Sequence, residues 1–247
     1  MIALVLAAGF GTRFRPETLT RPKPLLPLGG RPILFHVFDH LLGEGADAFV
    51  VNAHHLAEDL RRAVGESYAG VPVAWSVEEE ILGTAGGIRR AHARGLLGSG
   101  SFLVANGDAF TTLPLGRLLA RRHEADVASA LAVLPNGNPS ADTPLWADAK
   151  GRLVAVGGER PGEDVTGPWL FTGLQAATPA LAARIPPGFR ELARDVLAPS
   201  VAAGDGAFAL VPYAPSDGLF FDLGTRERLA AAEVAIAAAA ARARAAH

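Results

Sequence analysis

The chain has 247 residues, of which 49% are hydrophobic, and a formal net charge of −2 at pH 7. This composition can bury a sizeable core, and the weak negative charge argues against general binding to nucleic acids or anionic membranes. Because cysteine is absent, disulfides, thiolate metal sites and cysteine nucleophiles are excluded. We expect a cytoplasmic protein with no membrane partner, since no basic signal-peptide region is present and no stretch approaches ~18 consecutive apolar residues.

Short apolar runs and helical patterns alternate through the first half of the chain. The sequence predicts strands at residues 2–6, 48–52, 71–76 and 101–105, and helices at residues 32–43, 56–64, 84–94 and 115–123. Strands separated by helices are typical of βαβ units, so we expect a parallel sheet with helices on both faces. Ligands of such sheets bind at the carboxyl ends of the strands.

The second half of the chain has a less regular pattern. It predicts strands at residues 127–134, 152–156, 169–176 and 207–211, with loops at 135–144 and 157–167. Thr225 is the expected N-cap of an alanine-rich helix that ends at about residue 245. The apolar face of this helix is mostly alanine, so we expect it to pack weakly or to protrude. No repeat or long linker divides the chain, and we predict a single domain over residues 1–247.

A glycine-rich turn directly follows the first predicted strand, in the segment Leu6-Ala7-Ala8-Gly9-Phe10-Gly11-Thr12-Arg13. Glycine lets backbone N–H groups approach a bulky anion, because no Cβ stands in the way. Arg13 and Lys23, which lies between two prolines, add full positive charge. Phe14 stands where a P-loop and a dinucleotide fingerprint would each require glycine, so neither motif is present. We therefore predict a triphosphate-binding loop of another kind.

Two aspartates are candidate magnesium ligands. Asp108 follows an apolar run and the turn pair Asn106-Gly107, and Asp222 lies near the end of the apolar segment 219–223. Magnesium prefers oxygen ligands and usually takes only one or two carboxylates from a protein. The alternatives are turn chemistry for Asp108 and a helix cap for Asp222. If the fold brings these residues together, they form a two-carboxylate magnesium site.

The segment after the third predicted strand is a candidate nucleobase contact. Gly83 and Thr84 begin a predicted helix, and glycine there would let a flat base approach the backbone. Glu78 is the first of three adjacent glutamates, a pattern that usually marks a solvated loop, and we retain it as a nucleotide-binding candidate. The pair His54-His55 has no evident third metal ligand nearby, and we expect it to be structural.

Taken together, these motifs resemble the signature of the sugar-1-phosphate nucleotidylyltransferases. The resemblance spans most of the chain, in the expected order. It rests on the glycine-rich segment 6–13, Pro22-Lys23-Pro24-Leu25, Leu82-Gly83-Thr84-Ala85-Gly86, Val104-Ala105-Asn106-Gly107-Asp108 and Phe221-Asp222-Leu223-Gly224-Thr225. It implies a Rossmann-like α/β three-layer sandwich with a mixed, mostly parallel central sheet. It also implies the reaction of a nucleoside triphosphate with a sugar 1-phosphate to give an NDP-sugar and pyrophosphate.

The resemblance also implies a role for each matching residue. Arg13 and Lys23 would be catalytic, and Asp108 and Asp222 would bind Mg²⁺. The residues expected to bind the nucleotide are Leu6, Ala8, Gly9, Gly11, Thr12, Arg13, Lys23, Glu78, Gly83 and Thr84. Those expected to bind the sugar phosphate are Asn106, Glu159, Arg160 and Gly173. Many family members carry Glu-Lys-Pro where this chain has Glu159-Arg160-Pro161, which puts the phosphate contact of Arg160 in question.

The sequence leaves the substrates open. The chain resembles both N-acetylmuramate-1-phosphate uridylyltransferases and short mannose-1-phosphate guanylyltransferases, so UTP and GTP are both candidates. The alternatives are a cytidylyltransferase acting on a non-sugar phosphate and a catalytically inactive nucleotide-sensing subunit. Monomeric and homo-oligomeric states are both compatible with the sequence.

Overall fold

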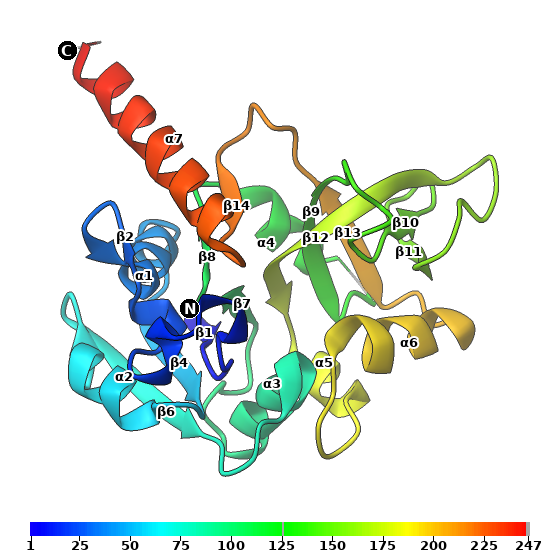
Figure 1. Cartoon of the computed structure of the whole chain (residues 1–247). Helices are drawn as coiled ribbons and strands as arrows, with labels where there is room; N and C mark the ends of the chain where they lie inside the picture. The colour runs from blue at the N-terminus through cyan, green and yellow to red at the C-terminus, as the bar shows by residue number, and fades with distance from the viewer. Residues whose placement is uncertain (125, 246–247) are drawn as a thin grey trace.

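The computed structural model describes residues 1–124 and 126–245 (Figure 1). Parallel strands form the centre of the main sheet, in the spatial order β7, β1, β4, β6. Their bounds are Phe102–Asn106 for β7, Ile2–Leu6 for β1, Ala48–Ala53 for β4 and Val71–Val77 for β6. Each boundary predicted for these strands lies within one residue of the observed one. These segments are continuous apolar runs because helices cover both faces of the sheet.

Antiparallel strands extend the sheet beyond β7. The long strand β12 (Thr166–Ala177) runs antiparallel to β7 and also pairs with β9 (Ser129–Pro135) and β10 (Leu145–Ala147). The remaining strands are β11 (Leu153–Val156) beside β10, β13 (Phe208–Pro212) parallel to β9, β5 (Ser67–Tyr68) beside β6, and the small pairs β8 (Ala109–Thr111) with β14 (Phe220–Asp222) and β2 (Pro27–Leu28) with β3 (Arg31–Pro32). The predicted Rossmann-like α/β fold with a mixed, mostly parallel central sheet is confirmed.

Helices pack on both faces of the sheet. One face carries α1 (Ile33–Gly43), α2 (Ala57–Val64) and α4 (Gly116–Arg122), and the other carries α3 (Gly83–Ala93), α5 (Pro179–Arg184) and α6 (Ala198–Ala202), which continues the π-helical turn Ala193–Leu197. Side chains of a strand alternate between these faces. In β1, Ala3 and Val5 join the core on the α1 side, whereas Leu4 joins the core on the α3 side.

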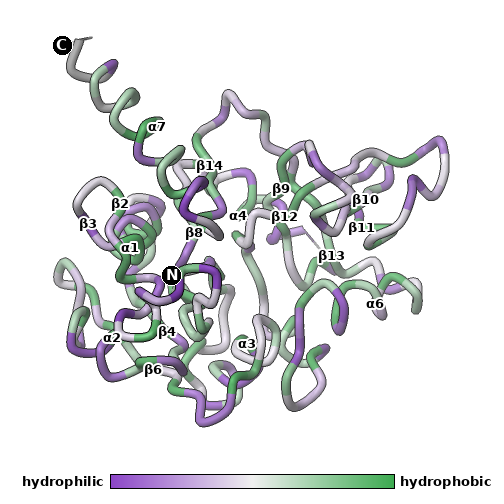
Figure 2. Tube along the Cα trace, viewed as in Figure 1, coloured by the Kyte–Doolittle hydropathy of each residue, from purple (hydrophilic) through white to green (hydrophobic). Residues whose placement is uncertain are grey.

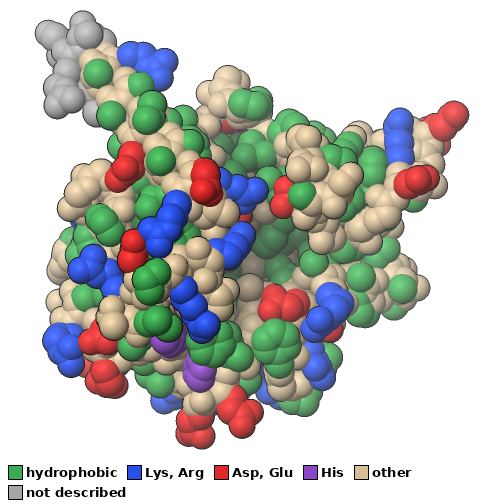
Figure 3. All heavy atoms as spheres, viewed as in Figure 1, with side chains coloured by type: hydrophobic (Ala, Val, Ile, Leu, Met, Phe, Trp, Pro, Cys, Tyr) green, Lys and Arg blue, Asp and Glu red, His purple; other side chains and the backbone are tan. Residues whose placement is uncertain are grey.

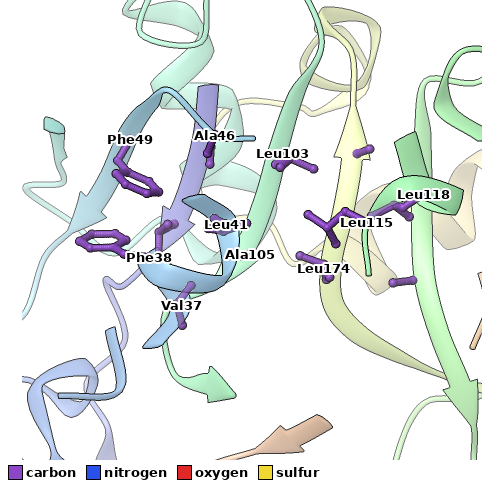
Figure 4. Packing of buried hydrophobic residues seen from close by; sticks show 14 of the residues in the cluster. Val37, Phe38, Leu41, Ala46, Phe49, Leu103, Ala105, Leu115, Leu118 and Leu174 are labelled. Atoms are coloured by element: carbon purple, nitrogen blue, oxygen red, sulfur yellow. The ribbon is translucent and has the colours of Figure 1, made fainter. Parts of the chain in front are cut away.

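The α1 side of the sheet has a densely packed core (Figure 4). Phe38 of α1 stacks on Phe49 of β4 with ring centroids 4.3 Å apart, and Val37 and Leu41 of α1 pack beside them. Figure 2 shows hydrophobic residues concentrated along the strands and hydrophilic residues along the outer loops. This rigid sheet fixes the strand ends from which the polar side chains described below project.

The C-terminal helix α7 (Arg226–Ala245) is capped as the sequence predicts, because the backbone N–H of Arg228 donates to Thr225 Oγ1 at 3.3 Å. Its first turns pack on a small core formed by Phe14, Leu223 and neighbouring residues, with Ala232 fully buried. Farther along, the helix extends away from the body of the protein (Figure 1), and Val234 is 71% exposed. None of the helices in the described residues combines the length and apolarity needed to cross a membrane.

Candidate active site

The loop after β1 folds back on itself at Gly11. This residue has a φ of 59°, and a Cβ there would lie 2.9 Å from both Lys23 Cβ and Thr18 Cγ2. Thr18 Oγ1 donates to the carbonyl oxygen of Gly11 at 2.8 Å. Only glycine fits both this backbone conformation and this close approach, so Gly11 holds the glycine-rich segment against the segment that carries Lys23.

The Lys23 ammonium is paired with the Asp108 carboxylate. Lys23 Nζ donates to Asp108 Oδ2 at 2.5 Å, and the Lys23 side chain is only 7% exposed. The ammonium also lies 5.5 Å from the centre of the Phe14 ring. A charge this deeply buried is costly unless it is paired, so the Asp108 carboxylate fixes the ammonium at the carboxyl end of β7.

The second predicted aspartate lies on the strand that pairs with the residues after Asp108. In the β8–β14 pair, Asp222 stands opposite Ala109, the residue that follows Asp108. Asp222 Oδ2 accepts a hydrogen bond from Arg228 Nη1 at 2.5 Å. The fold thus brings Asp108 and Asp222 to one edge of the sheet, and each carboxylate is paired with one cation.

These two carboxylates fit a magnesium ion chemically. They supply hard oxygen ligands, in the number that Mg²⁺ usually takes from protein. Within residues 1–124 and 126–245, no cluster of three or more histidine, cysteine, aspartate or glutamate side chains could hold a metal ion instead. Softer metals that need several nitrogen or sulfur ligands are therefore poorly matched to this site.

Arg13 lies directly against the backbone that follows Asp222. A Cβ on Gly224 would lie 2.8 Å from Nη1, 2.9 Å from Nη2 and 3.0 Å from Cζ of Arg13. The absence of a side chain at Gly224 therefore allows the guanidinium to occupy its position. Two segments far apart in sequence, the glycine-rich segment and the end of β14, meet at this contact.

A pocket of about 320 Å³, which we call the loop pocket, opens beside the glycine-rich segment. Figure 3 shows the hollow near the middle of this face, with Lys and Arg side chains along one side. Its wall also includes Asp108 and Gly224. Among the predicted nucleotide-binding residues, those that line it are Leu6, Ala8, Gly9, Gly11, Thr12, Arg13, Lys23, Gly83 and Thr84.

A second pocket, which we call the strand pocket, lies between β12 and β14. Apolar side chains form much of its wall, together with the polar side chains of Asp142, Asp222 and Arg228. It shares Arg13, Asn106 and Asp108 with the loop pocket. The two pockets therefore meet at one guanidinium, one amide and one carboxylate.

Gly173 supports this junction from β12. It has a φ of 80° and lies where the register of β12 against β9 shifts between Phe171 and Gln175. A Cβ on Gly173 would lie 2.2 Å from Asn106 Nδ2. Glycine at this position lets the Asn106 side chain lie against the strand.

The structure does not bring Glu159 and Arg160 to the two pockets. They belong to the loop between β11 and β12, which extends away from the body on the right of Figure 1. Arg160 Nη2 donates to the carbonyl oxygens of Glu163 at 2.6 Å and Val165 at 2.7 Å. In this structure the Arg160 guanidinium therefore stabilises its own loop.

Glu78 lies beneath the loop pocket and is only 2% exposed. Its Oε1 accepts from Asn52 Nδ2 at 2.8 Å, and its Oε2 accepts from the backbone N–H of Leu82 at 3.0 Å. Burial raises the pKa of the Glu78 carboxyl above its usual range. Asn52 Oδ1 in turn accepts from the N–H of Ala7 at 2.6 Å. Glu78 and Asn52 thus connect the end of β1 to the turn before α3.

The start of α3 is held by a distant segment that the sequence did not single out. Thr84 Oγ1 donates to Glu191 Oε2 at 3.1 Å and accepts from the N–H of Leu192 at 3.1 Å. A Cβ on Gly83, whose φ is 71°, would lie 2.5 Å from the carbonyl oxygen of Arg190. Glu191 therefore joins Gly83 and Thr84 in the wall of the loop pocket.

The histidine pair bonds to backbone carbonyls. His54 Nδ1 lies 3.0 Å from the carbonyl oxygen of Glu78, and His55 Nε2 lies 2.7 Å from that of Thr18. The Phe10 ring packs against both imidazoles, with centroids 5.4 and 5.5 Å away. These contacts anchor the glycine-rich segment and agree with the structural role that the sequence suggests.

Comparison with known proteins identifies the family. The sequence model of the nucleotidyl transferase family matches residues 2–141. The chain is 36% identical over 222 residues to the CMP-5'-(3-aminopropyl)phosphonate synthase of Streptomyces rubellomurinus, covering 88% of this chain and 33% of that protein. It is 35% identical over 189 residues to the N-acetylmuramate alpha-1-phosphate uridylyltransferase of Neisseria meningitidis serogroup B, covering 73% of this chain and 81% of that protein.

The chain belongs to the nucleotidyl transferase family, and its predicted resemblance to the sugar-1-phosphate nucleotidylyltransferases is confirmed. It spans about a third of the length of the Streptomyces relative. Its fold matches that of HddC from Yersinia pseudotuberculosis, solved in complex with GMP-PN, with a TM-score of 0.76 at 20% identity. That match covers 95% of this chain and 99% of the other, and it establishes the fold alone.

Proposed function

We propose that the protein transfers a nucleotidyl group from a nucleoside triphosphate to a sugar 1-phosphate, giving an NDP-sugar and pyrophosphate. The candidate substrates are UTP or GTP with N-acetylmuramate 1-phosphate or mannose 1-phosphate. The observation that carries this proposal is the junction of the two pockets at Arg13, Asn106 and Asp108. Two substrates bound side by side would react where their pockets meet.

The loop pocket suits the triphosphate. Backbone N–H groups of the glycine-rich segment would face the phosphates, and Arg13 and Lys23 would supply positive charge. The base would lie toward Gly83 and Thr84, whose backbone is fixed by the segment around Arg190. The strand pocket would then receive the sugar phosphate.

The chemistry is an in-line displacement at the α-phosphorus. An oxygen of the sugar phosphate attacks this atom, and pyrophosphate leaves on the opposite side. The nucleophile is already an anion at neutral pH, so the protein need not remove a proton. The barrier arises from bringing anions together and from charge that grows on the α-phosphate. Arg13 and Lys23 would lower it by positioning the phosphates and by presenting preorganised charge.

Asp108 and Asp222 are the residues that would hold Mg²⁺. When bound, the ion would neutralise phosphate oxygens and help to align the triphosphate. The pairing of each carboxylate with a cation keeps both acids in place at the junction. Retention of both acids and of Lys23 argues against a catalytically inactive sensing subunit, which would not need this set.

A matrix of nucleoside triphosphates against phosphorylated acceptors tests the proposal. Purified protein with Mg²⁺ is incubated with GTP, UTP, CTP, dTTP or ATP and each sugar 1-phosphate, and pyrophosphate release and product mass are recorded. We expect one pair to dominate, with the mass of an NDP-sugar. Absence of acceptor-dependent pyrophosphate release from every pair would refute the proposal.

A second candidate function is cytidylyl transfer to a non-sugar phosphate or phosphonate. The Streptomyces relative is named as a CMP-phosphonate synthase, and 88% of this chain aligns with it. In the strand pocket, Asp142 has no ion pair or side-chain hydrogen bond to the other described residues. Its carboxylate could accept a hydrogen bond from a sugar hydroxyl or from an ammonium group. Including an aminoalkylphosphonate with CTP in the matrix separates the two candidates.

A further inference from the structure

The acceptor phosphate needs a positively charged partner, and the structure offers one that the sequence motifs did not indicate. The motif candidate, Arg160, donates to carbonyl oxygens of its own loop and lines neither pocket. The cations that line the strand pocket are Arg13 and Arg228. Arg13 also belongs to the loop pocket, where it would face the triphosphate. Of these two cations, Arg228 lines only the strand pocket, which we propose to hold the acceptor.

Arg228 is held beside the junction by a weak interaction. Its Nη1 donates to Asp222 Oδ2 at 2.5 Å, and the two side chains are 48% and 47% exposed. An exposed ion pair contributes little to stability. The pair orients the guanidinium toward the pocket, but an incoming phosphate could share or replace it at little cost. The planar guanidinium can also bind two phosphate oxygens at once.

The position of Arg228 opposes the electrostatics of its own helix. It lies in the first turn of α7, where the helix dipole favours anions and disfavours cations. Residues that break a local rule of this kind are expected where function requires them. A phosphate bound at Arg228 would reverse the local penalty, because it would place negative charge near the start of the helix.

We propose that Arg228 binds the phosphate group of the acceptor and holds it against the α-phosphate of the nucleotide. This inference rests on the proposed function. Arg13 and Arg228 would stand on the two sides of the attack, one at each phosphate, and would reduce the repulsion between the reacting anions. Arg228 would thus make the contact with the acceptor phosphate that the family resemblance implies for the residue at position 160.

Steady-state kinetics of Arg228→Gln, at saturating Mg²⁺, test the proposal. We expect the KM for the acceptor to rise about 10- to 100-fold, because the variant loses a charge-assisted contact to this substrate. The KM for the nucleoside triphosphate should change by less than about twofold, because Arg228 does not contact that substrate. Arg228→Lys should recover part of the effect. Arg242→Gln, on the exposed end of the same helix, is the matched control for charge and helix stability.

Equilibrium titration with inorganic phosphate, in the presence of a non-hydrolysable triphosphate analogue, probes the same contact without turnover. Phosphate should bind the wild type and Arg242→Gln equally and bind Arg228→Gln at least 10-fold more weakly. Equal phosphate binding by Arg228→Gln and the wild type would overturn the role of Arg228, as would a rise in acceptor KM for Arg160→Gln and not for Arg228→Gln. An inactive wild type would refute the proposed function, whereas the phosphate titration would still decide on Arg228.

Discussion

Substitution of Gly224 by alanine should displace the Arg13 guanidinium, which we propose to be catalytic, without unfolding the protein. The new methyl group would lie 2.8–3.0 Å from three atoms of the Arg13 guanidinium, whereas ordinary contacts of a Cβ begin at 3.4 Å. The guanidinium must therefore move by about 0.5 Å or more. Because it is the end of a flexible side chain, it can move at little cost in stability, and Gly224 does not have a positive φ.

The expected loss is in turnover. Misplacement by 1 Å can cost about 10²-fold in rate. A shift of between about 0.5 and 1 Å should therefore lower kcat by about 10- to 100-fold, or ~1.4–2.7 kcal/mol. Pyrophosphate release at saturating substrates measures this loss. Thermal unfolding should show a Tm equal to or slightly above that of the wild type, since replacing glycine restricts the unfolded chain.

A double-mutant cycle separates this mechanism from a general disturbance. In an Arg13→Ala background there is no guanidinium for the methyl group to displace, so Gly224→Ala should have almost no further effect on kcat. Gly116→Ala is a matched control, because a Cβ there meets no heavy atom within 4 Å. Full activity of Gly224→Ala, or an equal loss in the Arg13→Ala background, would refute the reasoning.

Three further substitutions test other parts of the site. Lys23→Ala should lower turnover about 10²–10³-fold, the scale of removing one electrostatic donor, and wild-type kcat would contradict its role. Asp108→Asn should lose magnesium-dependent turnover yet keep its circular dichroism spectrum, and a wild-type rate with Mg²⁺ would disprove the metal assignment. Glu78→Ala should lower the free energy of unfolding by ~1–3 kcal/mol in urea titrations, because it leaves the buried donors of Asn52 and Leu82 without an acceptor. Burial raises the pKa of Glu78, so its contribution to stability is complete below the ordinary carboxyl pKa and is lost as the pH rises through the raised value. The stability difference between wild type and Glu78→Ala should therefore shrink with rising pH, and a difference that grows would contradict the sign.

The central strands and the first helices could be predicted because their pattern is local. Continuous apolar runs at residues 2–6 and 48–52, separated by a helical pattern, indicate buried parallel strands without any tertiary information. The short strands β8 and β10 have three residues each, too few to show a period. Their existence depends on partners far along the chain, such as β14 for β8.

The candidate site likewise contains residues that the local sequence indicates and residues that only the fold brings to the site. Glycine and charge between residues 9 and 23 indicate an anion-binding loop from the sequence alone. Glu191 and Arg228 could not be selected in this way, because an exposed-looking charged residue gains its role only when the fold carries it to a pocket. Asn52 offered a weak signal, a polar residue near the end of a buried strand. The loop at residues 159–161 keeps the glutamate and the proline of the family motif, with Arg160 in place of the lysine, and the Arg160 side chain bonds within its own loop.

Following labelled phosphates through the reaction tests the central claim most directly. The nucleoside triphosphate that is active in the matrix is supplied with ³²P at the α position or at the γ position, together with its acceptor and Mg²⁺. Attack at the α-phosphorus places the α label in the nucleotide-linked product and the γ label in pyrophosphate. Recovery of the γ label as inorganic phosphate, or of the α label in a nucleoside mono- or diphosphate that lacks the acceptor, would contradict nucleotidyl transfer at the junction of the two pockets.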